Sequence, residues 1–107
     1  MQASVAEKRI DLRLDDDQQI TLTGPVSGEY DICAKSWGFY ASPSFRTRLR
    51  KFGLRPVLFK DAKNHRRFAI VESARTDIFS KWLAEMKGVV VAWLDEEPDA
   101  LLRALKD

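Results

Sequence analysis

The sequence predicts an α+β domain with a two-layer, ferredoxin-like core, and three observations lead to this prediction. Between residues 30 and 94, strand and helix patterns follow one another in the order β-α-β-β-α-β, which defines that arrangement. The length of 107 residues suits one domain. A hydrophobic content of 45%, with three Trp and six Phe, supplies side chains for one core. We expect a single domain over 1–107, with the core at 30–94 and a short terminal helix at 98–106.

The N-terminal part is expected to add a β-hairpin to this core. Residues 1–6 show no clear pattern and are expected to be frayed. Apolar and polar residues alternate over 8–14 and again over 20–23, which is typical of strands with one buried face. The acidic stretch at 15–19 suits the turn between them, so the hairpin is expected over 8–23.

The first strand and helix of the core have separate signals. A strand is expected at 30–34, and an aromatic stretch follows it. The helix is expected to begin at Ser42, a good N-cap residue before Pro43, and to end at Gly53. Its apolar stripe recurs at helical spacing and consists of Phe45, Leu49 and Phe52.

The rest of the core is expected to contain three strands and one helix. Residues 54–60 and 66–72 have strand patterns on either side of a polar turn. A helix is expected over 76–87, because apolar residues recur on one face and Gly88 follows. Residues 89–94 are apolar at every position, so we expect both faces of that strand to be buried. The N-terminal hairpin or a second copy of the chain is expected to cover its second face.

The charge of the chain is segregated, although the formal net charge is only +2. Residues 1–34 hold three Lys/Arg and seven Asp/Glu, which gives −4. Residues 35–67 hold ten Lys/Arg and one acid, which gives +9, and residues 68–107 hold five and eight, which gives −3. The basic middle third favours an anionic partner.

The first hypothesis is a small non-enzymatic domain that binds a polyanion through its arginine-rich first helix. Nucleic acid is the expected polyanion. Arginine makes bidentate contacts to phosphate, and a helix start offers free N–H groups. Aromatic side chains just before the helix would stack on bases. The expected anion-binding residues are Ser42, Ser44, Arg46, Arg48, Arg50, Lys51, Arg55, Arg66 and Arg67, and the expected stacking residues are Trp37, Phe39 and Tyr40.

Two other functions stay open. One is a protein-interaction module or homodimer that buries the second sheet face, with the arginines meeting acidic segments of a partner. The other is a small phosphate-ligand site at the Ser42–Arg46 corner. The simplest interpretation of the basic helix face is a solvated surface that acidic segments at 15–17 or 95–97 balance.

No catalytic, metal or cofactor site is expected. Cys33 and His65 have no third residue to orient them as nucleophile and base, and no Cys/His spacing suits zinc. Since Cys33 is the only cysteine and the N-terminus has no signal-peptide pattern, we expect a cytoplasmic protein. No stretch approaches the ~18 apolar residues of a membrane span.

Two resemblances follow from these patterns. The element order and the strand at 66–72 resemble RNA-recognition motifs, whose strand signature is basic-Gly-aromatic-small-aromatic-aliphatic-x-aromatic. Four positions match that signature: Arg66, Phe68, Ala69 and Val71; three depart from it: Arg67, Ile70 and Ser73. The block Trp37-Gly-Phe-Tyr-Ala-Ser-Pro-Ser44 with Arg48-Leu-Arg-Lys-Phe-Gly-Leu-Arg55 resembles one in short bacterial proteins of unknown function. That resemblance covers residues 31–94 and implies no activity.

Overall fold

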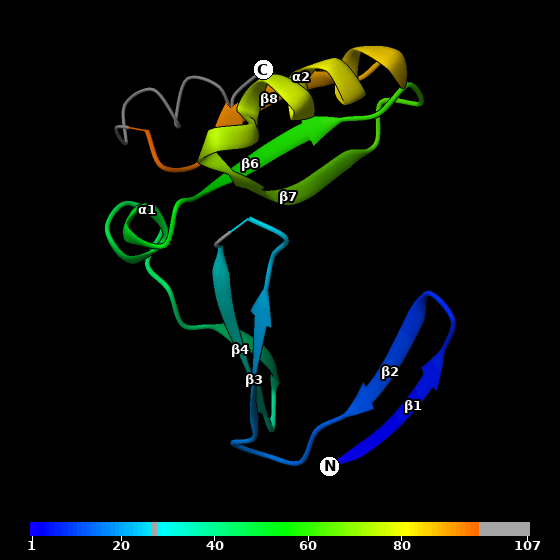
Figure 1. Ribbon diagram of the computed structural model, residues 1–107, viewed down its shortest axis with the longest axis vertical. Coiled ribbons are helices and arrows are strands. Elements are labelled where there is room, and N and C mark those ends of the chain that lie inside the picture. The colour runs from blue at the N-terminus through cyan, green and yellow to red at the C-terminus, as the bar shows by residue number, and fades with distance from the viewer. Residues whose placement is uncertain (27, 97–107) are drawn as a thin grey trace.

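The computed structural model describes residues 1–26 and 28–96, and strands dominate this part of the chain. Its eight strands form three small antiparallel sheets (Figure 1). The elements are β1 (Gln2–Ala6), β2 (Arg9–Arg13), β3 (Gln19–Thr23), β4 (Glu29–Lys35), β5 (Gly38–Ala41), α1 (Arg48–Lys51), β6 (Leu54–Lys60), β7 (Arg66–Glu72), α2 (Thr76–Glu85) and β8 (Val89–Trp93), with a 3-10 turn at Ser73–Arg75. The helix expected at 98–106 lies outside the described residues.

The predicted ferredoxin-like core is wrong, because the strands expected to form its one sheet lie in two different sheets. We name the three sheets the arm (β1-β2), the middle sheet (β3-β4-β5) and the α2 sheet (β7-β6-β8). The expected first core strand is β4, and its two edges are taken by β3 and by β5, a strand that the sequence patterns missed. Short turns connect β4 to both neighbours, so these pairings cost little loop-closure entropy. Both edges of β4 are then occupied, and β4 cannot pair with a strand of the α2 sheet.

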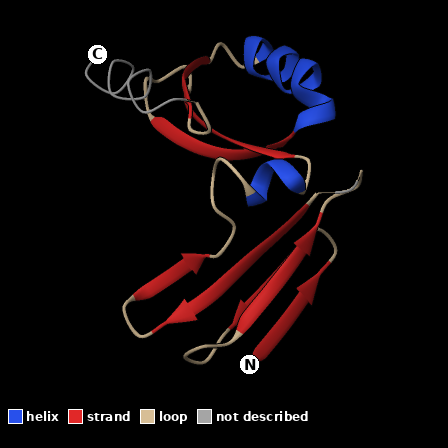
Figure 2. Ribbon diagram, turned by 90° about the vertical axis from the view of Figure 1, so that its left-hand side faces the viewer, coloured by secondary structure: helices blue, strands red, loops and turns tan. Residues whose placement is uncertain are grey.

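The N-terminal hairpin also differs from the expectation. Residues 1–6 are not frayed but contain β1, which pairs with β2 from Gln2↔Arg13 to Ala6↔Arg9. The hairpin predicted over 8–23 is therefore wrong, since β3 pairs with β4 instead of β2. No residue of β1 or β2 is buried, so the arm extends from the rest of the molecule (Figures 1 and 2).

The main core lies between α2 and one face of the α2 sheet. The predicted strands at 54–60 and 66–72 are confirmed, and α2 and β8 lie within the predicted ranges. Four buried side chains form the core, and further apolar groups, including Phe79 and Trp93, pack against it. They are Val57, Phe59, Val71 and Leu83. The expected burial of both faces of 89–94 is wrong: β8 is an edge strand, and Val89 is 60% exposed.

The arginine-rich helix is much shorter than predicted. Only Arg48–Lys51 is α-helical, and turns occupy the residues before it. Ser42 does not begin the helix; the Ser44 hydroxyl instead accepts a hydrogen bond from the Arg48 N–H at 3.2 Å. Ser and Thr hydroxyls compete for backbone groups in this way and favour turns over helix. Gly53, with φ of 71°, stops the helix as predicted.

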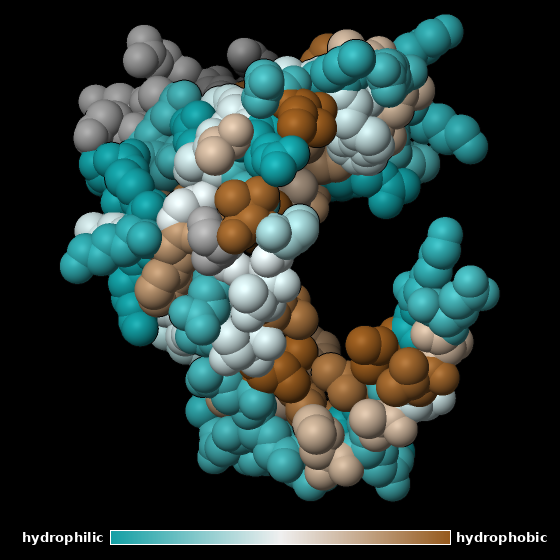
Figure 3. Space-filling view, viewed as in Figure 1, coloured by the Kyte–Doolittle hydropathy of each residue, from teal (hydrophilic) through white to brown (hydrophobic). Residues whose placement is uncertain are grey.

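The three sheets surround an open hollow. The arm and the middle sheet form one side, and the α2 sheet forms the other (Figure 1). The radius of gyration is 15.4 Å, whereas a compact chain of this length has about 13 Å. Apolar surface lies along the hollow in the space-filling view (Figure 3). No helix in the described part of the chain has the length and apolar character needed to cross a membrane.

Candidate functional site

Three basic side chains of α1 form an exposed basic patch, which we define as Arg48, Arg50 and Lys51. Leu49 anchors the helix, because its side chain is fully buried. None of the three makes an ion pair with another residue in the described part of the chain. Arg46 is exposed just before the helix and already has an interaction partner.

Arg55 does not belong to this patch, because Asp95 holds it. Its Nε and Nη2 atoms donate to the two carboxylate oxygens of Asp95 at 2.8 and 3.0 Å. Its guanidinium also lies 4.1 Å from the centre of the Trp93 ring. Burial alone would raise the pKa of Asp95, but the hydrogen bonds and charge of Arg55 lower it below its ordinary value. Arg55 is thus a structural cation in this fold.

Arg67, near the start of β7, is likewise paired, with Asp61 of the turn between β6 and β7. Its Nε donates to Asp61 at 2.8 Å. Asp61 also accepts the backbone N–H groups of Lys63 and His65, both at 2.9 Å. The Arg67 hydrogen bond, with the backbone N–H of His65 next, lowers the pKa of Asp61 to about 2. Arg66 is exposed at the start of β7 and has a partner of its own.

The structure does not assemble the expected stacking platform beside α1. Phe39 and Tyr40 are neighbours on β5, so their side chains point to opposite faces of the middle sheet. Trp37 lies in the β4–β5 turn, where Lys35 donates to Asp17 of the acidic loop at 2.6 Å. The predicted Ser44 hydroxyl is also engaged locally, since it accepts the Arg48 N–H and contacts the Thr47 hydroxyl.

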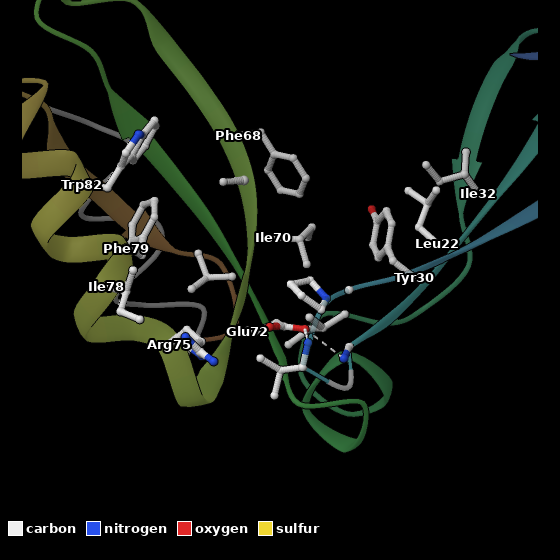
Figure 4. A pocket seen from close by; sticks show the side chains of 17 residues that line it. Leu22, Tyr30, Ile32, Phe68, Ile70, Glu72, Arg75, Ile78, Phe79 and Trp82 are labelled. Carbon is white, nitrogen blue, oxygen red and sulfur yellow. Dashed lines mark hydrogen bonds between the residues drawn. The ribbon is translucent and has the colours of Figure 1, made fainter. Parts of the chain in front are cut away.

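An apolar recess lies elsewhere, between the middle sheet and the α2 sheet, and the sequence did not predict it. It has a volume of about 810 Å³. We call it the β7 groove and define it by three sets of residues. The middle sheet contributes Leu22, Tyr30 and Ile32; β7 contributes residues 68–72; and α2 contributes Ile78, Phe79 and Trp82 (Figure 4).

The edge of β7 runs along this groove. Five consecutive β7 residues line it, although successive side chains of a strand point to opposite faces. Phe68 and Ile70 project toward the middle sheet, and the α2 side chains lie on the other side of the strand (Figure 4). β7 is also an outer strand of its sheet. The groove therefore exposes a strand edge whose outward N–H and C=O groups have no strand partner among the described residues.

One end of the groove is polar and holds the two sheets together. The Glu72 carboxylate accepts the backbone N–H groups of Val26 and Gly28 at 3.3 and 3.1 Å. Gly28 has to be small, because a Cβ there would collide with the Leu54 side chain. Arg75 lines the same end. This contact fixes the middle sheet beside β7 and so shapes the groove.

Most of the groove is apolar and open to solvent. Phe68, Ile78 and Trp82 are 50%, 51% and 48% exposed. The arm adds apolar surface, because Val5 pairs with Ile10 on one face of its two strands and these side chains are 75% and 63% exposed. Large exposed apolar surfaces of this kind mark interaction sites.

The residues considered for metal binding and nucleophilic chemistry are not brought together in the described part of the chain. The described residues contain no group of three or more His, Cys, Asp or Glu side chains that would hold a metal ion. His65 is exposed and lies beside Asp61, with 3.7 Å between Nδ1 and Oδ2. The Cys33 thiol contacts the Ala34 carbonyl oxygen at 3.6 Å. Each of the two residues is thus engaged with a different neighbour.

A signal for the groove exists in the sequence, although its meaning needs the fold. Phe68 and Ile70 lie on the face of β7 opposite Ala69 and Val71, so this strand is apolar on both faces. One face meets α2 in the core. On the other face the Phe68 ring stacks on Phe45, with 6.4 Å between the ring centres, and is still half exposed. The comparisons with known proteins name no candidate: no protein-family model, curated protein or solved structure matches this chain.

Proposed function

We propose that this chain is a protein-interaction module that receives an extended segment of a partner along the open edge of β7. The observation that carries the proposal is the β7 groove itself, in which an unpaired strand edge lies between two apolar walls. Strand addition uses such an edge for main-chain hydrogen bonds and the walls for side-chain selection.

The strand edge favours a polypeptide over a small molecule. Its outward backbone groups are spaced to pair with another strand, and a polypeptide supplies N–H and C=O groups at the same repeat. The expected partner segment is apolar on both faces. One face would meet Tyr30 and Ile32 of the middle sheet, and the other would meet Ile78 and Trp82 of α2.

Selection from a displayed library of random peptides tests this function. We expect the wild-type chain to select segments with apolar residues at successive positions, and Ile78→Lys to abolish their binding. Val89→Lys is the matched control, because Val89 is also an exposed β-branched residue but lies on β8, at the other edge of the α2 sheet. Peptides that bind both variants as tightly as they bind the wild type, or no selection at all, would contradict the proposal.

A second candidate function rests on the basic patch of α1. Arg48, Arg50 and Lys51 are exposed and lie within one helical turn, which supports binding of a polyanion such as nucleic acid. Fewer basic side chains support this function than the sequence suggested, because Arg55 and Arg67 have acidic partners.

Fluorescence anisotropy with labelled single-stranded and duplex oligonucleotides tests this second function. A real interface predicts affinity that falls steeply with salt, and loss of binding in the double variant Arg48→Glu/Arg50→Glu. The control Lys8→Glu/Lys81→Glu makes the same change in net charge at two exposed lysines away from α1. Equal loss in both variants would show a non-specific effect of net charge and would refute the patch.

A further inference from the structure

The geometry points to a second copy of this chain as the partner, paired antiparallel along β7 about a two-fold axis at Ala69. This inference rests on the proposed function, because it names the strand that the β7 groove receives. The two α2 sheets would join into one continuous sheet across the axis. Two-fold pairing of identical surfaces is the commonest symmetry of soluble oligomers.

The sequence of β7 is self-complementary in this register. A two-fold axis perpendicular to the sheet places residues at equal distances on either side of Ala69 opposite each other, on the same face. Phe68 then faces Ile70 of the second copy, an aromatic–β-branched pair that stabilises neighbouring strands. Both residues project into the groove (Figure 4), so the contact needs no change of face.

The charges at the two ends of β7 fit the same register. Arg66 begins the strand and Glu72 ends it, so each arginine lies opposite the glutamate of the second copy. Both side chains already have partners within their own chain, and the cross-strand attraction adds to these. Opposite charges that face each other across strands stabilise pairing, and like charges destabilise it. The net charge of +2 gives little repulsion between copies.

Other exposed apolar side chains border the strand that the second copy would add to. The groove offers Leu22, Phe68, Ile78 and Trp82, each about half exposed, and the arm offers Met1, Val5, Ile10 and Leu12. They supply apolar surface toward the roughly 800 Å² that each partner of a standard interface buries. The arm borders the hollow that the second copy would enter (Figure 3).

Sedimentation velocity of the full chain over a range of concentrations tests this register by charge reversal. We expect a reversible dimer in the wild type. Arg66→Glu places like charges opposite each other at both ends of the pair, and we expect a dissociation constant at least about tenfold weaker. Glu72→Arg places two arginines opposite each other at both ends, and we expect the same weakening. A mixture of these two single variants restores opposite charges at both ends and should form a heterodimer.

Two further variants keep the test decisive if Glu72→Arg disturbs the Val26 and Gly28 contacts. Phe68→Lys should prevent dimerisation, and Val89→Lys on β8 should not. A monomeric wild type, or a dimer that neither Arg66→Glu nor Phe68→Lys weakens, overturns the self-pairing. The proposed function survives either result if selected peptides still bind the groove in an Ile78-dependent way. It fails separately if those peptides do not bind.

Discussion

Removal of the Asp95 carboxylate is expected to destabilise the α2 sheet strongly. Asp95 is only 4% exposed, and its two oxygens accept both hydrogen bonds from Arg55. The substitution Asp95→Ala leaves the guanidinium without its counter-ion. Loss of one partner of a fully buried pair costs about 3–5 kcal/mol. Because the Arg55 side chain is 30% exposed and regains some hydration, we expect about 2–3 kcal/mol.

Urea denaturation at neutral pH, followed by tryptophan fluorescence, measures this loss. Trp93 lies under the Arg55 guanidinium, so in a variant without Trp37 and Trp82 its emission also reports whether the cation has moved. The expected loss corresponds to a melting temperature roughly 8–12 °C lower for a domain of this size. Asp11→Ala is the control, because its ion pair with Arg9 is exposed and should contribute at most about 1 kcal/mol.

Two results would refute the structural role of this pair. One is a loss below about 1 kcal/mol in Asp95→Ala, which is the range of an exposed pair. The other is strict additivity of Arg55→Ala and Asp95→Ala in a double-mutant cycle.

The pH dependence provides a third check. Since the folded-state pKa of Asp95 is lowered, the pair stabilises the fold above about pH 4 and loses this effect as the pH falls further.

The remaining predictions concern the β6–β7 turn and the end of α2. The pKa of Asp61 is about 2, so its stabilising effect should be complete above about pH 4 and be lost as the pH falls through 2; an NMR titration midpoint near 3.8 would contradict this. Gly88→Ala should cost about 1–3 kcal/mol in urea denaturation, because a Cβ there would lie 2.7 Å from the Lys60 carbonyl oxygen. A loss below about 0.5 kcal/mol would show that the backbone adjusts.

The individual elements of the α2 sheet could be predicted because their signals are local. Strand patterns on either side of a polar turn indicate β6 and β7, and Asn64, with φ of 68°, provides the turn conformation between them. The pairing of strands into sheets could not be predicted in the same way. The two edges of β4 are filled by β3 and β5, and β5 is a short aromatic strand that the alternation did not separate from a loop.

The basic patch and the β7 groove were harder to predict, because each depends on contacts between residues far apart in the sequence. Arg55 and Asp95 are forty residues apart in the sequence, so the arginine count overstated the basic surface. The β7 groove needs two separate sheets that meet through Glu72. The sequence contained a trace of it in the apolar character of both faces of β7. The same strand contains the residues that partly match the RNA-recognition signature.

Amide hydrogen exchange of β7 tests the central claim most directly. Exchange is measured for the wild-type chain with and without a peptide selected for groove binding, and β8 serves as the internal reference because it is the other edge of the same sheet. Strand addition predicts that the outward amides of β7 become protected while those of β8 keep their rates. Equal changes at both edges, or unchanged exchange along β7 in the saturated complex, would contradict the claim.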